Sequence, residues 1–207
     1  MFKRTSISFL VLLALSAILA PPLQAGQGSD RIEVKDGQIL FEFTGQVMSP
    51  GATSEQYGYF TYVAGVDDLF TGVPANEGSA RLTFFREATN VLVSINGSLK
   101  VIMREGTTTV YAAVSAADFT NPDSFRSGTP VLTSTFRQQV VYDPTLGNFN
   151  VVNQETITDT DSFTINGQRY QIGKRGDVYR TTKTGISDPN AASFLGFFGG
   201  YSVGANR

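Results

Sequence analysis

The fold is decided by a short stretch, VLVSINGSLKVI (residues 91–102), in which apolar and polar side chains alternate on both sides of Asn96-Gly97. A period of two residues is that of a β-strand with one buried face. Asn-Gly tolerates the positive φ angles of a type I′ turn, so the stretch predicts a two-residue β-hairpin with Asn96-Gly97 at its centre. The same pattern recurs in FTINGQRY (residues 163–170), around Asn166-Gly167.

Outward from these hairpins, runs rich in Val, Thr, Ile and aromatic residues alternate with clusters of Gly, Asn, Asp and Pro, and helix signals are scarce. We expect about 12 short strands, over residues 38–48, 57–64, 80–86, 90–95, 98–104, 107–114, 130–142, 148–158, 162–165, 168–172, 177–184 and 194–203. This density predicts a single all-β domain over residues 31–207, folded as an antiparallel barrel or, alternatively, as a two-sheet sandwich.

The strand density and hairpin order resemble, at the level of the fold, small exported antiparallel barrels of the calycin-like, allene-oxide-cyclase-like and dirigent-like kinds. The resemblance implies a calycin-like or allene-oxide-cyclase-like barrel and implies no function, because one fold hosts many functions. The polar faces of the strands carry mostly Thr, Ser, Gln and Arg. Such faces suit either an outer surface or a wet barrel interior, and the sequence does not separate the two.

The N-terminus has the pattern of a secretory signal peptide. Two basic residues precede an apolar run over residues 7–19, and a small residue follows at position 25. This pattern predicts cleavage of residues 1–25, a flexible leader over residues 26–30, and a secreted or periplasmic protein; the alternative is an uncleaved N-terminal anchor. No later apolar run reaches 18 residues, so we expect no transmembrane segment in the mature chain.

The composition excludes several classes of protein. The chain has no Cys and no His, so disulfides, Cys/His zinc sites and His-dependent nucleophiles are impossible, and we expect no cofactor. The mature chain keeps 14 basic residues against 18 acidic ones, hence a formal net charge of −4. Without a basic cluster we expect no nucleic-acid partner. The lack of Cys in an exported chain favours a bacterial origin.

Five residues are candidates for ligand binding: Tyr57, Tyr59, Tyr62, Arg104 and Arg137. Exposed aromatic rings stack on ligands or partners, although aromatic residues in strands more often pack in a core. Arginines in strands can line a pocket for an anion, although pairing with a carboxylate across strands is commoner.

Oxygen-bearing side chains cluster in the longest segment without strand character, residues 116–129. Asp118, Asn121 and Asp123 are weak candidates for a calcium site, since calcium takes oxygen ligands from such loops. Asx turns explain the same residues without a metal.

Paired carboxylates could support glycoside hydrolysis without His. The acids in or near strands are Glu42, Glu87, Glu105 and Glu155. The sequence does not show whether any two of them face each other, so no catalytic residue is assigned.

The aromatic, glycine-rich tail Phe194–Tyr201 predicts a closing strand and, alternatively, a surface for homo-oligomers or attachment. Taken together, the sequence predicts an exported, non-enzymatic β-barrel that binds a small apolar ligand or a cell-surface partner. The first alternative is a cofactor-free cyclase or isomerase, marked by a cavity with a buried carboxylate of raised pKa. The second is a structural or adhesive envelope protein, marked by a filled core and an exposed aromatic tail.

Overall fold

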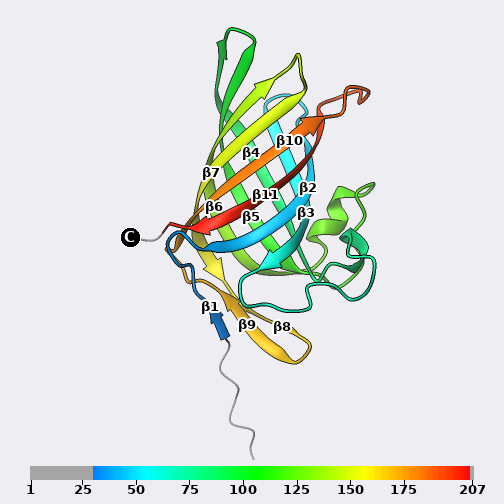
Figure 1. Cartoon of the computed structure of the whole chain (residues 1–207), viewed down its shortest axis with the longest axis vertical. Coiled ribbons are helices and arrows are strands. Elements are labelled where there is room, and N and C mark those ends of the chain that lie inside the picture. Colours follow the sequence, from blue (N-terminus) through cyan, green and yellow to red (C-terminus); the bar gives the residue numbers. More distant parts are fainter. Residues whose placement is uncertain (1–29, 206–207) are drawn as a thin grey trace, which may run out of the picture.

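The computed structural model describes residues 30–205, and eight of its strands close into an antiparallel barrel (Figure 1). In spatial order these are β10 (Val178–Ser187), β11 (Leu195–Gly204), β2 (Ile39–Met48), β3 (Thr53–Val63), β4 (Leu82–Asn96), β5 (Leu99–Ala112), β6 (Thr129–Asp143) and β7 (Asn148–Thr160). β7 pairs back onto β10, which completes the closure. The predicted all-β barrel is confirmed, and the sandwich alternative is wrong.

The described residues contain 11 strands rather than about 12. The runs predicted over 80–86 and 90–95 form the single strand β4, because a bulge between Asn90 and Leu92 bends the strand without ending it. The runs over 98–104 and 107–114 likewise form β5. The short strand β1 (Asp30–Ile32) has no predicted counterpart. The predicted signal peptide, residues 1–25, and all but the last residue of the predicted leader lie outside the described residues.

The two Asn-Gly sequences form hairpins of different kinds. Asn166 and Gly167 have φ angles of 49° and 84°, so the type I′ prediction is confirmed there. At the other hairpin Asn96 pairs with Leu99, and the two-residue loop is Gly97-Ser98. Only Gly97 among these residues has a positive φ, 61°, which is the pattern of a type II′ turn. The type I′ prediction at Asn96-Gly97 is therefore wrong.

The tip of the β4–β5 hairpin extends beyond the barrel wall (Figure 1). β3 pairs with β4 only up to Thr89, so residues 91–96 have a neighbouring strand on one side alone. Val91, Leu92, Val93 and Ile95 are all exposed, by 44% to 69%. Alternation in this stretch marks the strand correctly, but neither face of the tip is buried.

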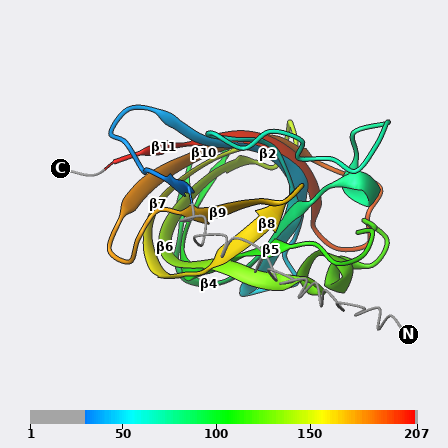
Figure 2. The same cartoon turned by 90° about the horizontal axis from the view of Figure 1, so that it is seen from below.

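One end of the barrel is closed by a small three-stranded sheet (Figures 1 and 2). β8 (Ser162–Ile165) and β9 (Gln168–Ile172) form a hairpin, and β1 pairs with β9 in parallel. Phe163, Ile165 and Ile172 are buried and join the main core. At the opposite end lie the turns that connect β2 to β3, β6 to β7 and β10 to β11. The interior is therefore reached from that second end, the mouth of the barrel.

The segment over residues 113–128 folds against the outer face of β3 and β4. It contains the 3₁₀ helix η2 (Pro122–Arg126), and a second one, η1 (Glu77–Ser79), precedes β4. Phe125 of η2 is fully buried, and its carbonyl accepts a 2.8 Å hydrogen bond from the Thr83 hydroxyl. The segment thus forms a small second core outside the barrel. Within residues 30–205 no helix has the length and apolar character needed to cross a membrane.

Candidate functional site: a cationic cavity in the barrel mouth

A belt of buried polar side chains crosses the barrel interior. The belt residues are Gln56, Arg86, Thr108, Ser134, Gln138, Asn153, Glu155, Tyr179, Thr181, Lys183 and Ser202, from seven of the eight barrel strands. Each stands at an inward position of its strand, since successive side chains point to opposite faces. The polar strand faces therefore point partly into the barrel, a question that the sequence left open.

Glu155 is the centre of this belt and is completely buried. Its Oε1 lies 3.0 Å from Nη2 of Arg86 and accepts a 2.8 Å hydrogen bond from Thr181. Its Oε2 accepts 2.9 Å hydrogen bonds from Thr108 and Tyr179. Burial alone would raise the pKa of Glu155, but the charge of Arg86, the hydrogen bonds from Thr181 and Tyr179 and the charge of Lys183 lower it below its ordinary value. Glu155 is thus held as a carboxylate, not as the buried acid of raised pKa that would mark an enzyme.

The guanidinium of Arg86 is enclosed by aromatic rings. Its Cζ lies 5.6–5.8 Å from the ring centres of Phe43, Phe84 and Phe136. Its Nε and Nη1 have no hydrogen-bond partner among the described residues, and the ring faces provide the favourable surroundings for the cation instead. The charge of Arg86 is therefore stabilised by the ion pair with Glu155 and by cation–π contacts with the rings.

Lys183 stands on the mouth side of Glu155, two residues along β10 from Thr181. It is buried; its Nζ donates to Oε1 of Gln56 and lies 5.0 Å from the ring centre of Phe198. Among the described residues no carboxylate oxygen lies within 4.0 Å of Nζ. Burial, and next the charge of Arg86, lower the pKa of Lys183 well below its ordinary value.

Arg104 lies nearer the mouth and is also buried without an acidic partner in the described part of the chain. Its Nε donates a 2.8 Å hydrogen bond to Oδ1 of Asn90, and its Nη2 donates a 3.0 Å hydrogen bond to the Ser49 hydroxyl. Burial lowers the pKa of Arg104 to about 10. The guanidinium therefore remains charged at neutral pH while its hydrogen bonds go to neutral oxygens.

These two cations line a cavity of about 210 Å³ in the barrel mouth. Apolar and aromatic side chains form about half of its wall, polar and charged side chains form most of the remainder, and exposed or half-buried residues form the rim. The lining residues are Val47, Ser49, Gly51, Gln56, Asn90, Lys100, Ile102, Arg104, Gln138, Val140, Tyr142, Phe149, Val151, Lys183, Phe194 and Phe198. Three of them are cations and none is an acid. The cavity thus combines apolar and polar walls with a positive lining.

Of the five predicted ligand-binding residues, Arg104 lies in the cavity wall and the other four lie elsewhere. Tyr57 and Tyr59 pack in the outer core under residues 113–128. Tyr62 is 42% exposed, and Arg137 is exposed on the outer face of β6. The structure brings none of the three tyrosines to Arg104.

Sequence reasoning missed Lys183 and its partner Gln56. The signal for Lys183 lies in the alternation of β10, where it shares a face with Tyr179, Thr181 and Gly185. A single Lys on the buried face of a strand is unusual, since lysines are almost never fully buried without a partner.

The three calcium candidates lie in the outer segment, away from the cavity. Oδ1 of Asp118 accepts a 2.8 Å hydrogen bond from the Thr120 amide, and this bond lowers the pKa of Asp118. Asp123 pairs with Arg126 at 2.6 Å, and the Asn121 carbonyl accepts from the Ser124 hydroxyl. These contacts are those of a hydrogen-bonded turn. In the described part of the chain, no three or more acidic side chains are grouped to hold a metal ion.

Of the four carboxylates considered for a hydrolytic pair, only one lies inside the barrel. Glu42, Glu87 and Glu105 are exposed, whereas Glu155 is buried.

The fold and the cavity together define a class: a closed eight-stranded antiparallel barrel with one end capped and, at the other, a cationic cavity whose wall is about half apolar. Comparison of the chain with models of protein families, with curated proteins and with solved structures gave no significant match. The chemistry of the cavity is therefore the main indication of function.

Proposed function

We propose that this barrel binds a small, mainly apolar molecule that carries one anionic group, as a calycin-like carrier rather than as an enzyme. The observation that carries the proposal is the cavity lining, which combines aliphatic and aromatic walls with Lys100, Arg104 and Lys183 and contains no acid. An eight-stranded barrel has the width to hold one small ligand. The proposal includes export, as the pattern of residues 1–25 suggests.

The size of the cavity limits the ligand. A cavity of about 150 Å³ holds benzene, whereas pockets for drug-sized molecules begin at about 300 Å³. At about 210 Å³ the cavity lies between these sizes. A carboxylate with a short alkyl chain, such as octanoate, matches both the volume and the chemistry of the lining.

An anionic group would relieve an electrostatic cost that the empty barrel carries. Arg104 as a cation and Lys183 as an amine of lowered pKa are buried without a carboxylate partner among the described residues, and an uncompensated buried charge such as that of Arg104 is unfavourable. A bound carboxylate would accept charge-assisted hydrogen bonds from these donors, each of which contributes about 1.5–3 kcal/mol. The alkyl chain would gain further free energy from contact with the apolar wall.

Titration calorimetry with three eight-carbon probes tests the proposal. We expect octanoate to bind more tightly than octanol, and octanol more tightly than octylamine, because only the head group differs. Octylamine or octanol binding as tightly as octanoate would contradict the anion preference. If none of the three binds, the proposed function is wrong.

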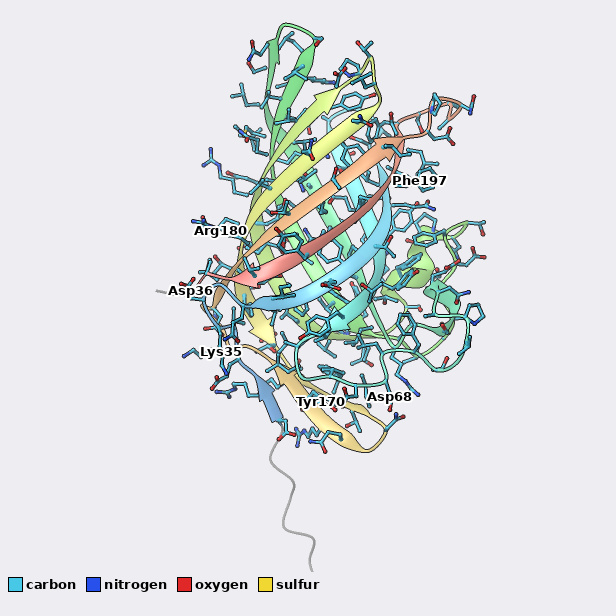
Figure 3. All side chains as sticks on the ribbon, in the orientation of Figure 1. Lys35, Asp36, Asp68, Tyr170, Arg180 and Phe197 are labelled. Atoms are coloured by element: carbon cyan, nitrogen blue, oxygen red, sulfur yellow. The ribbon has the colours of Figure 1, made fainter. Side chains whose placement is uncertain are left out.

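A matched pair of arginine variants locates the site. Arg104→Gln removes the charge from the cavity wall, and we expect octanoate affinity to fall about tenfold or more, equivalent to about 1.4 kcal/mol. Arg180 projects outward from β10 (Figure 3) and is exposed. Arg180→Gln makes the same chemical change outside the barrel and should leave the affinity unchanged.

A second candidate function uses the outer surface of β11, within Phe194–Tyr201. Phe198 points inward, whereas Phe197 and Tyr201 are 41% and 47% exposed, and Phe197 projects from the wall in Figure 3. Phe197 pairs across strands with Ile186, which is also exposed. This apolar patch favours self-association or attachment to a cell-surface partner. Sedimentation of the wild type and of Phe197→Ser should show self-association that the variant loses; a monomeric wild type would exclude self-association.

A further inference from the structure

We propose that Lys183 forms a covalent imine with a carbonyl carbon of the bound ligand, so that the ligand class of this cavity is an apolar oxo acid. The inference rests on the proposed function, because it places the ligand in the same cavity with its carboxylate near Arg104. It adds a bond that simple carriage of an anion does not require.

The position of the amine supports this assignment. Lys183 is 2% exposed, and it forms part of the cavity lining together with Arg104 and Gln138. The hydrogen bond from Nζ to Oε1 of Gln56 uses a hydrogen of the amine and leaves the nitrogen lone pair unused. Gln56 in turn donates from Nε2 to Oε1 of Gln138 at 3.4 Å. The amine is therefore held in the cavity wall by neutral amides.

The surrounding charges favour the neutral, nucleophilic form of this amine. Glu155, the buried acid of the belt, is paired with Arg86 at 3.0 Å, so that its charge is already balanced. Burial and the charges of Arg86 and Arg104 lower the pKa of Lys183, while Glu155 raises it in part. A lysine desolvated in an apolar pocket or placed beside another cation is the usual form of an amine that makes a Schiff base. No step needs His or a metal.

The backbone opposite Lys183 leaves room for its side chain. Lys183 pairs across strands with Gly200, and a Cβ at Gly200 would press first on the backbone oxygen of Thr182 and would also stand 2.9 Å from Cγ of Lys183. Any larger residue at this position would press on the lysine stem. The glycine thus keeps the amine in its place in the wall.

The reaction balances without an oxidant or reductant. The Nζ lone pair of neutral Lys183 attacks the carbonyl carbon, a C–N bond forms, and the carbonyl oxygen takes up a proton while Nζ loses one, giving a carbinolamine. Loss of the hydroxyl group with one further proton from Nζ releases one water and leaves a C=N bond. The overall change is amine plus carbonyl giving imine plus water, and hydrolysis reverses it.

Reductive trapping tests the inference on the purified wild-type protein. The probe is 2-oxooctanoate, and sodium cyanoborohydride converts an imine into a stable secondary amine that peptide mapping locates. Each unit by which a lysine pKa is lowered increases its neutral fraction about tenfold near neutral pH. We therefore expect Lys183 to be labelled at least about tenfold faster than the exposed Lys35, and octanoate to suppress labelling at Lys183 alone.

Lys183→Arg removes the nucleophilic amine, so this variant should lose the adduct. Equal labelling of all lysines, or no adduct at Lys183 in the wild type, would overturn the inference whether or not the variant folds. If octanoate still binds in that case, the proposed function stands and only the imine is wrong. If octanoate does not bind either, both fail.

Discussion

The ion pair between Glu155 and Arg86 gives the sharpest test of how the barrel interior is stabilised. Glu155→Gln keeps the shape of the side chain and removes its charge. Arg86, which is buried and has two nitrogen atoms without hydrogen-bond partners in the described structure, would then lose its only carboxylate partner there. The amide would also present an NH₂ group to a site where Thr181, Thr108 and Tyr179 all donate to Glu155.

The magnitude follows from this geometry. Removing one partner of a buried ion pair costs about 3–5 kcal/mol, because the other charge remains buried without compensation. For a domain of this size 1 kcal/mol corresponds to about 2–4 °C in melting temperature, so we expect a decrease on the order of 10 °C. Replacing both members, in Glu155→Gln with Arg86→Met, should cost less than the two single changes together by more than about 1 kcal/mol.

The pH dependence has a definite sign. The folded pKa of Glu155 is lowered relative to the unfolded value of about 4.3. Its contribution to stability is therefore fully present above the unfolded pKa and is lost as the pH falls through the folded pKa. The stability difference between wild type and Glu155→Gln should accordingly be constant above about pH 5 and shrink below about pH 4.

Urea denaturation followed by circular dichroism, repeated from pH 3 to pH 8, measures both effects. Glu42→Gln is the matched control, because Glu42 is exposed on β2 and its neutralisation should change stability by no more than about 0.5 kcal/mol. A loss in Glu155→Gln as small as that of the control would refute the view that this buried pair holds the interior together. A loss that grew on acidification would refute the lowered pKa.

Two further predictions concern backbone positions. Gly200→Ala should destabilise the barrel by about 1–3 kcal/mol, because its Cβ would press on the backbone oxygen of Thr182 and stand 2.9 Å from Cγ of Lys183. At Gly199 the nearest atom is 3.8 Å away, so Gly199→Ala should cost less in thermal melts. Asn166→Ala should lower the free energy of unfolding by about 1–2 kcal/mol, because the φ of 49° at this position is strained for Ala. Asn96→Ala, at a position without a positive φ, should change it by no more than about 0.5 kcal/mol in urea titrations. Equal losses in the two variants would contradict the different turn types.

The all-β class, the antiparallel order and most strand positions could be predicted from the sequence, because turn residues and period-two alternation are local signals. The division of β4 and of β5 into two strands each was wrong for a physical reason. Gly106 looked like a turn residue, but it lies inside β5, where Phe136 covers the space that its missing Cβ leaves, with Cζ 2.9 Å from the ideal Cβ position. A glycine that makes room for an aromatic ring across the sheet is indistinguishable, in one sequence, from a glycine that makes a turn.

The candidate site was harder to predict because alternation shows that two faces differ without showing which one points inward. Arg104 could be singled out as a strand arginine, but Arg137 and Arg180 fit the same description and point outward. The outer core over β3 buries aromatic residues that lie on the outer face of the barrel and that the sequence suggested were exposed. Tyr57 resembles an exposed binding residue in sequence, yet Phe125 covers it, with ring centres 5.3 Å apart, from a segment about 70 residues away.

The distribution of charge inside the barrel explains why the cavity, rather than the belt below it, is the place for a ligand. Glu155 receives one cation and several hydroxyl donors, so the charges of Glu155 and Arg86 at the centre of the belt balance each other. Lys183 and Arg104 above it donate to amide and hydroxyl oxygens, which accept hydrogen bonds without supplying negative charge. A protein that needed only a stable core would gain from apolar residues at both positions, since buried charges without partners cost stability. Keeping the Arg104 cation and the Lys183 amine beside the cavity is favourable only if a negatively charged group enters it, and the apolar half of the wall suits a ligand whose remainder is apolar.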